Sequence, residues 1–270
     1  MVALLLSALS GALLSAAFEP VGKWWVAPIA IAVHMYALSI SSRKVLSSFI
    51  FGLTLNLIVL HWSSTFVGSI PWVILAIGLS LLYLPLALVS KWGITAYPLI
   101  YILLEEVRNR FPFGGFGWVR IAFTQADAPY AKVAAIGGAT ALSAAVVLIA
   151  LVIFHISHRK FSLLPLLPFL IVLVPVNTSV VDSTNVLMIQ GNVPQMGLDF
   201  NSRAKAVFSN HFERTQMEIA KNPNVDFILW PENSVDVDPF LNSDVESGLD
   251  SITKPLIIGA IMNKASNLLN

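Results

Sequence analysis

A carboxylate that directly follows a short apolar run is the group in this chain best placed to do chemistry. Val225–Trp230 is typical of a buried strand, and Glu232 follows it after Pro231. Proline cannot donate to a sheet ladder, so the strand should end there. Open α/β sheets bind ligands outside the carboxyl ends of their strands. Glu232 is therefore our candidate catalytic carboxylate, although its spacing also fits an ordinary solvated loop residue.

The composition indicates a membrane protein with a polar tail. Of the 270 residues, 56% are hydrophobic and 11% are charged, whereas soluble domains carry about 25% charged residues. Residues 1–181 contain ten Lys and Arg against four Asp and Glu, a balance of +6, and residues 182–270 contain six against eleven, a balance of −5. This pattern predicts a transmembrane helix bundle over residues 1–181 and a separate domain over residues 182–270. The net charge of the chain, +1, is too small to indicate nucleic-acid binding.

The hydropathy pattern predicts about seven membrane helices, since a span needs about twenty mostly apolar residues. The expected segments are residues 1–17, 24–40, 45–62, 70–89, 93–104, 133–156 and 161–176. Seven spans place the three purely basic loops, at Arg43-Lys44, Lys91 and Arg159-Lys160, on one side. The positive-inside rule makes that side cytoplasmic. The amino terminus is then inside and the polar tail outside.

The longest connection in the membrane half, residues 105–132, is rich in Gly, Arg and aromatic residues. Arg108, Phe116, Trp118 and Arg120 have two readings: an interfacial aromatic belt with a turn, or a loop that binds lipid and offers guanidinium groups to phosphate. We expect Glu105 or Glu106 to pair locally with Arg108 or Arg110, because an unpaired carboxylate at a helix end in the membrane is costly.

Several further polar residues have simpler interpretations. His34, His61 and His155 are scattered without ligand spacing, so we expect packing or helix-end roles and no metal site. Asn56 lies in the middle of an apolar segment and should hydrogen-bond between helices. The absence of cysteine excludes disulfides, cysteine metal sites and a thiol nucleophile within these 270 residues.

The polar tail alternates short β-rich runs with helical periodicity. We expect strands near residues 185–190, 225–230 and 255–261, and helices over residues 202–221, with Ser202 as the cap, and 239–252. The β-α-β-α-β order predicts an α/β layer architecture. Asp236 and Asp238 are typical of acidic residues that lead into helices. His211 shows no partner and is interpreted as a surface residue.

Five motifs in the same order give the chain a family resemblance. They are Phe18-Glu19-Pro20, the stretch from Glu106-Val107-Arg108 through Phe116-Gly117-Trp118 to Phe123-Thr124-Gln125-Ala126-Asp127, Ile189-Gln190-Gly191-Asn192-Val193-Pro194-Gln195, Leu229-Trp230-Pro231-Glu232-Asn233-Ser234, and Ile258-Gly259-Ala260. Together they resemble the apolipoprotein N-acyltransferases, and they extend over nearly the whole chain. No single motif is specific, but the combination is.

The resemblance implies a helix bundle in the bacterial inner membrane and a nitrilase-like domain on its outer, periplasmic face. It implies a Glu-Lys-Cys triad that transfers an acyl group from a phospholipid to the diacylglyceryl-cysteine of a lipoprotein, with no cofactor and no metal. The cysteine forms a thioacyl enzyme, the glutamate is the general base and the lysine stabilises the oxyanion. Glu232 matches the family's glutamate.

The chain departs from the family pattern. In the family the catalytic lysine and cysteine lie well downstream of the glutamate, and these 270 residues do not include them. Lys254 and Lys264 do not stand in the family's lysine context. We therefore expect a truncated, incomplete nitrilase-like domain and a chain that is inactive by itself. The alternative is a non-catalytic membrane subunit that binds lipid or lipoprotein, or that complements a second chain carrying the lysine and the cysteine. A seven-helix transporter fits less well, because charged residues inside the spans are nearly absent.

Overall fold

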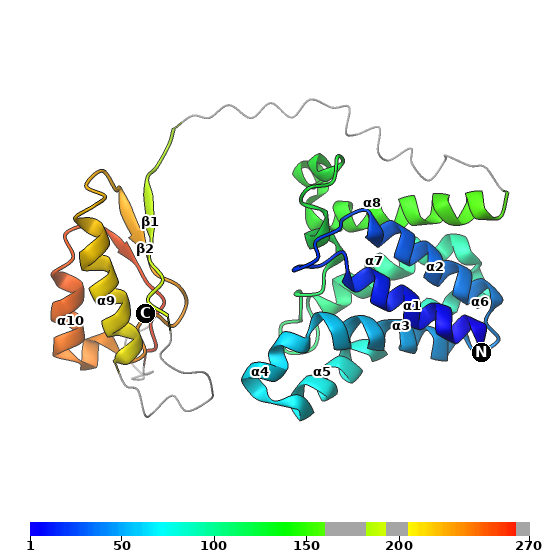
Figure 1. Ribbon diagram of the computed structural model, residues 1–270, viewed down its shortest axis with the longest axis horizontal. Helices are drawn as coiled ribbons and strands as arrows, with labels where there is room; N and C mark the ends of the chain where they lie inside the picture. The colour runs from blue at the N-terminus through cyan, green and yellow to red at the C-terminus, as the bar shows by residue number, and fades with distance from the viewer. Residues whose placement is uncertain (160–181, 193–204, 263–270) are drawn as a thin grey trace. The chain divides into compact units, whose positions relative to one another are not determined.

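The structure is a computed structural model that describes residues 1–159, 182–192 and 205–262. The chain divides into two compact units, Met1–Asn177 and Thr178–Asn270, and each has its own hydrophobic core (Figure 1). The expected boundary between residues 181 and 182, and the nitrilase-like nature of the second unit, stay predictions. Residues 160–181 lie outside the described part of the chain.

The described part of the first unit is helical. Its α-helices are α1 (Val2–Ser15), α2 (Val26–Ile40), α3 (Lys44–Val59), α4 (Ser64–Val67), α5 (Ser69–Leu81), α6 (Val89–Trp92), α7 (Tyr97–Arg108) and α8 (Ala134–Ser157). Six of the seven expected apolar segments coincide with this helical structure, and the seventh, residues 161–176, lies outside the described residues. α7 begins later than expected and extends to Arg108, so Glu105 and Glu106 are helical residues.

Two described helical stretches are long and apolar enough to cross a membrane, Ser69–Trp92 and Ala131–Ser157. A third span results if α3 and the following stretch, His61–Val67, are counted together across their 51° bend. α1 and α2 are shorter apolar helices. The helical membrane character is thus supported, whereas the count of seven spans stays a prediction.

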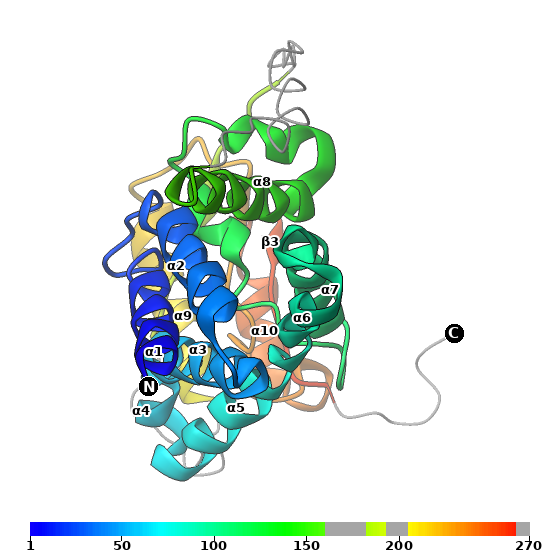
Figure 2. The ribbon, with the colours of Figure 1, turned by 90° about the vertical axis from the view of Figure 1, so that its right-hand side faces the viewer.

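The helices enclose a main core, and a smaller cluster lies at Ala122, Val133 and Leu142. α2 lies between α1 and α8, while α3 packs against α1 and α5 and α7 packs against α8 (Figure 2). α1 and α3 approach closely at Gly11, where an added Cβ would lie 2.5 Å from the carbonyl oxygen of Phe51. Small residues at helix contacts permit such packing in membranes. Asn56 Nδ2 donates to Ser80 Oγ at 3.3 Å, which confirms the predicted bond between helices.

His34 has the packing role expected from the sequence. Its ring is fully buried and stacks on Phe51, with ring centroids 4.1 Å apart. Its Nδ1 lies 2.8 Å from the Tyr97 hydroxyl, which joins α2 to α7. Among the described residues, no group of three or more His, Cys, Asp or Glu side chains could hold a metal ion.

The basic loops gather at one end of the bundle, together with the amino terminus. Met1 and Arg43 line the same cavity, and Arg43 and Ser90, which precedes Lys91, line another. The ring of His158 packs against Tyr36 near the end of α2, with centroids 5.8 Å apart. These contacts bring the first two basic loops and the amino terminus to the same end of the bundle, whereas the shared membrane side of all three loops stays a prediction.

The second unit contains a three-stranded parallel sheet in the order β1-β2-β3. Its elements are β1 (Val186–Met188), α9 (Ala206–Ile219), β2 (Phe227–Leu229), α10 (Ser243–Asp250) and β3 (Leu256–Ile257). The inward-facing Leu187 and Ile228 pack with α9 and α10 in one core. Side chains alternate between faces along a strand, and the opposite face exposes Val186, Met188 and Ile257. The β-α-β-α-β prediction is confirmed.

The interpretation of His211 as a surface residue was wrong. Its side chain is only 1% exposed, and its ring lies beside Trp230 with centroids 5.5 Å apart. His211 Nδ1 lies 2.8 Å from the Val207 carbonyl oxygen one helical turn earlier. The error arose because the polar imidazole occupies a core-facing position of α9. Ser202, the expected cap of this helix, lies outside the described residues.

Candidate functional site

Glu232 lies where the sequence predicts it, in the turn that follows the central strand. Ile228 on β2 is fully buried, whereas Pro231, Glu232 and Asn233 are exposed. The carboxyl ends of parallel strands meet at one edge of the sheet, so this turn lies at the edge where α/β sheets bind ligands. Within the described part of the chain, the Glu232 carboxylate forms neither a hydrogen bond nor an ion pair. It is therefore free to accept a proton from a substrate or a nucleophile.

The segment after β3 fixes the backbone of this turn. Val235 N donates to the Gly259 carbonyl oxygen at 3.1 Å, and Ser234 Oγ donates to the same oxygen at 3.2 Å. A Cβ added at Gly259 would lie 2.7 Å from Glu232 Cα. Only glycine permits this approach, and Gly259 belongs to the Ile258-Gly259-Ala260 motif. The motif thus fixes the turn that carries Glu232.

The motif after β1 serves a similar packing purpose. A Cβ added at Gly191 would lie 2.5 Å from the His211 backbone nitrogen and 2.7 Å from its Nδ1. Gly191, in the segment that follows β1, therefore lies directly against α9. Three motifs separated in sequence, at Gly191, Glu232 and Gly259, thus follow the three adjacent strands of one sheet.

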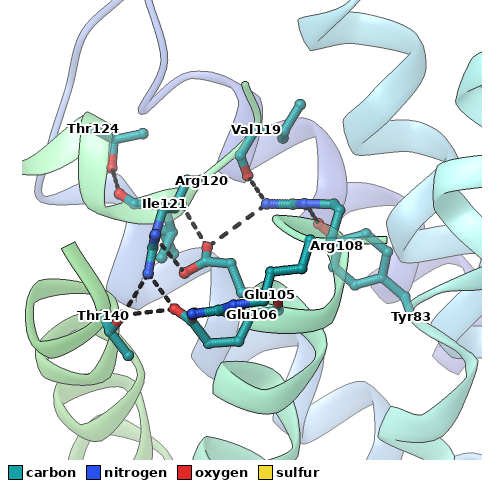
Figure 3. A network of polar contacts seen from close by, with 10 residues as sticks. Tyr83, Glu105, Glu106, Arg108, Val119, Arg120, Ile121, Thr124 and Thr140 are labelled. Carbon is teal, nitrogen blue, oxygen red and sulfur yellow. Dashed lines mark hydrogen bonds and ion pairs between the residues drawn. The ribbon is translucent and has the colours of Figure 1, made fainter. Parts of the chain in front are cut away.

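In the first unit, Arg108 joins three parts of the bundle (Figure 3). Its side chain is only 3% exposed. Its Nη1 donates to the Tyr83 hydroxyl at 2.7 Å, and its Nη2 donates to the Val119 carbonyl oxygen at 2.5 Å. Arg108 therefore connects α7 to the segment after α5 and to the loop that follows α7. With these donors engaged, its guanidinium faces the protein interior.

Glu105 balances this buried guanidinium. Its carboxylate is also 3% exposed and lies 3.8 Å from Arg108 Nη2 and 3.5 Å from Arg120 Nε. The backbone N–H of Ile121 donates to Glu105 Oε1 at 2.8 Å. The space beside this pair measures about 10 Å³, which is room for about one water. The buried pair thus fills the interior and leaves no ligand pocket.

Glu106 forms the outer part of the same network. Its carboxylate pairs with Arg120 and with Arg110. Thr140 Oγ1, on α8, donates to Glu106 Oε1 at 2.6 Å. The prediction that Glu105 or Glu106 pairs locally with Arg108 or Arg110 is confirmed, and both glutamates do so. Tyr83 and Thr140 were not predicted, because each is more than twenty residues away and no local spacing signals them.

The loop after α7 folds back because of its glycines. Phe116 N donates to the Arg108 carbonyl oxygen at 2.7 Å. Gly115 has a φ of +91°, and a Cβ added there would lie 2.2 Å from the Asn109 carbonyl carbon. A side chain at this position would meet both left-handed backbone strain and a direct clash. Gly115 therefore permits the return that brings Val119, Arg120 and Ile121 to the network.

Phe116 and Trp118 lie in an aromatic row beside the end of α3. Trp118 stacks on Trp62 with centroids 4.8 Å apart, and Phe116 stacks on Trp118 at 6.0 Å. Trp118 is 62% exposed, so the row presents aromatic surface that suits a membrane interface. The structure brings all four predicted binding residues into one loop region. Arg108 is enclosed, Arg120 is ion-paired, and Trp118 is accessible.

Comparison with known proteins shows the family to which the chain is related. A family model described as the apolipoprotein N-acyltransferase N-terminal domain matches residues 10–152. An apolipoprotein N-acyltransferase of Mycolicibacterium smegmatis is 29% identical over 91% of this chain and 49% of its own length. One from Photobacterium profundum is 29% identical over 86% of this chain and 50% of its own length. One from Shewanella oneidensis is 26% identical over 93% and 53%. The chain spans about half the length of these relatives.

Proposed function

The chain belongs to the apolipoprotein N-acyltransferase family, and from this membership we propose that it takes part in acyl transfer from a phospholipid to a lipoprotein. The acceptor is the α-amine of an N-terminal diacylglyceryl-cysteine. The chain supplies the helix bundle that holds the lipid-facing loop, and it supplies Glu232 as the general base. The observation that carries this proposal is the exposed, unpaired carboxylate of Glu232 at the carboxyl end of the central strand.

The chemistry assigns Glu232 one proton in each half of the reaction. Its carboxylate accepts the proton of a cysteine thiol, and the thiolate attacks the acyl ester of the phospholipid. The ester C–O bond breaks, and the lysophospholipid leaves with a proton from the glutamic acid. The lipoprotein amine then attacks the thioester and its surplus proton passes to the Glu232 carboxylate. The C–S bond breaks to leave the amide, and the glutamic acid returns the proton to the thiolate. A lysine stabilises the oxyanion in both steps.

The thiol in this scheme must come from outside the 270 residues, because they include no cysteine. We therefore expect no acyl transfer by this chain alone. The exposed sheet face at Val186, Met188 and Ile257 supports the alternative of complementation by a second chain. Parallel sheets are ordinarily covered on both faces, so this face suits a further layer that brings the lysine and the cysteine.

The test is an acylation assay on a synthetic diacylglyceryl-cysteine peptide, with the product followed by mass spectrometry. The chain is assayed alone and together with the separately expressed carboxyl-terminal half of the Mycolicibacterium smegmatis relative. We expect transfer only with both chains, and a loss of about 10²- to 10⁴-fold with Glu232→Gln, the range of general acid–base catalysis. Glu246→Gln, a change of another exposed carboxylate, is the matched control.

Two outcomes would contradict the proposal. Transfer by the chain alone would remove the need for a thiol supplied from outside. Full transfer by the Glu232→Gln variant in the complemented pair would remove the general base. If Glu246→Gln lost as much activity as Glu232→Gln, the effect would be one of surface charge and not of the strand end.

We further propose a bacterial inner-membrane location with the amino terminus in the cytoplasm and residues 182–270 on the outer, periplasmic side. The gathering of Arg43, Ser90 and Met1 at one end of the bundle supports this orientation through the positive-inside rule. The chain has no native cysteine, so a single one introduced as Ser183→Cys or Ser42→Cys reports sidedness. An impermeant maleimide added to intact spheroplasts should label the first and not the second.

A further inference from the structure

A groove of about 660 Å³ opens at the basic end of the bundle. It lies between the start of α3 and the stretch from the end of α5 to α6. Its volume falls within the range of about 300–1,000 Å³ typical of small-molecule sites. Its walls are mostly apolar and one rim is basic, and the lining residues are Ser42, Arg43, Lys44, Val45, Leu46, Phe49, Leu81, Leu84, Ala87 and Ser90.

Arg43 and Lys44, the cations at this rim, form no ion pair with an acidic residue in the described part of the chain. All the residues that line the groove come from the stretch between Glu19 and Glu105. That stretch contains no Asp or Glu. Lys44 Nζ donates one hydrogen bond, to the Ser41 carbonyl oxygen at 2.8 Å, and the ammonium group has two further N–H donors. The rim therefore offers positive charge to an anionic group.

The walls below this rim suit an acyl chain. Leu46 is 38% exposed and Leu81 is 51% exposed, and both line the groove. Leu81 and Leu84 belong to the candidate span Ser69–Trp92, of which only 33% is buried inside the protein. Most of the apolar window of that stretch is therefore not buried inside the protein. A ligand here would meet cations at one end and hydrocarbon along its length.

We propose that this groove binds an anionic phospholipid, with its phosphate at Arg43 and Lys44 and one acyl chain along Leu46, Leu81 and Leu84. Basic pockets between membrane helices on the cytoplasmic side bind anionic headgroups in this manner. The groove adjoins the first turns of α3, whereas Trp62 and Trp118 lie beyond its last turn. The sixteen residues of α3 separate these ends by about 24 Å. The lipid bound here is therefore not held at the aromatic loop.

The test measures lipid retention by the full chain, purified in detergent, using native mass spectrometry. The probes are dioleoylphosphatidylglycerol and dioleoylphosphatidylcholine at equal concentration, which share acyl chains and differ in headgroup charge. We expect retention of phosphatidylglycerol to be about tenfold stronger, and the double variant Arg43→Gln/Lys44→Gln to abolish that preference. The control Lys23→Gln/Lys132→Gln removes two exposed cations at the other end and should leave the preference intact.

A second variant addresses the acyl-chain wall. Leu46→Gln keeps both cations but places an amide in the wall, and it should lower the retention of both lipids about equally. Soluble glycerol 3-phosphate, which has the phosphate without the tail, should not displace phosphatidylglycerol. The proposal is wrong if both lipids are retained equally by the wild type, if the Lys23/Lys132 control loses the preference, or if glycerol 3-phosphate displaces the lipid. A dimer seen in place of lipid adducts would assign the groove to a second copy of the chain.

Discussion

Two glutamates of this chain lie in opposite environments, and the contrast separates structure from chemistry. Glu105 is 3% exposed and is surrounded by Arg108, Arg120 and the Ile121 N–H. Glu232 is exposed, and within the described residues its carboxylate has no partner. A buried carboxylate needs such partners, because an unpaired buried charge is very costly. Glu105 is therefore committed to holding the bundle, and Glu232 is available to a reactant.

The same contrast between buried and exposed groups separates motif residues that hold the fold from motif residues that a ligand could reach. Arg108 belongs to the Glu106-Val107-Arg108 motif, yet its donors serve Tyr83 and Val119 inside the protein. It is best understood as a positioning residue that holds the loop carrying Trp118. Gly259 likewise holds the Glu232 turn without taking part in chemistry. A residue in a family motif can therefore serve the fold alone, without any contact with a substrate.

The largest expected effect comes from Arg108→Gln, which tests whether the buried network is structural. The shorter amide cannot replace both donated bonds, and Glu105 loses the more deeply buried of its two countercharges, with only Arg120 left. Breaking a buried ion pair in this way costs about 3–5 kcal/mol. The thermal unfolding midpoint of the full chain in detergent should therefore fall by about 10 °C.

Matched controls for this change lie in the same loop and at the strand end. Arg110 is 63% exposed, so Arg110→Gln should cost less than about 1 kcal/mol. Glu232→Gln should change stability by no more than about 0.5 kcal/mol, as surface substitutions do. If Arg108→Gln unfolds no earlier than these two variants, the contrast between the glutamates fails.

A smaller effect is expected from Gly115→Ala, which tests the loop that closes the network. The new Cβ would meet the Asn109 carbonyl carbon at 2.2 Å in addition to the strain of a φ of +91°. We expect a loss of about 2–3 kcal/mol in stability, measured by the same unfolding assay.

Gly114→Ala is the matched control, because Gly114 has the same φ of +91° and nothing within 4 Å of an added Cβ. It should lose about 1 kcal/mol, the contribution of backbone strain alone. Equal losses from the two variants would show that the close approach to Asn109 does not matter.

The sequence predicted the elements of both regions better than their tertiary contacts. Hydropathy located six of the helical segments, and short β-rich runs located three strands, because both signals are local. Closeness in sequence likewise predicted that Glu105 or Glu106 pairs with Arg108 or Arg110, although it did not say which pairs form. Tyr83 and Thr140 join the network from other helices, so no spacing could reveal them. His211 was misjudged because a polar side chain gives no sign that its helix position faces a core.

The smallest expected effect concerns the exposed pair Lys205–Asp244, which joins the approach to α9 with the first turn of α10. Lys205 Nζ donates to both Asp244 carboxylate oxygens, at 2.8 and 2.7 Å, and this hydrogen bonding lowers the pKa of Asp244 below its ordinary value of 3.8. A carboxylate with a lowered folded-state pKa stabilises the fold above its unfolded pKa and loses that contribution as the pH falls through the folded value. Asp244→Asn should therefore destabilise this unit slightly at pH 6, and the difference from the wild type should shrink as the pH falls below 3.8.

Urea-dependent pulse proteolysis of the full chain, read at peptides from residues 205–250, measures this difference between wild type and variant. The pair is exposed, with side chains 36% and 63% accessible, so the difference at pH 6 should also shrink in 1 M salt as the charges are screened. Asp250→Asn, at the end of the same helix, is the control, because Asp250 forms no ion pair among the described residues. A salt-insensitive loss that persists at pH 3 would mean that Asp244 acts through helix packing and not through charge. The stability that Asp244 adds would then come from packing contacts, as it does in the buried network around Glu105.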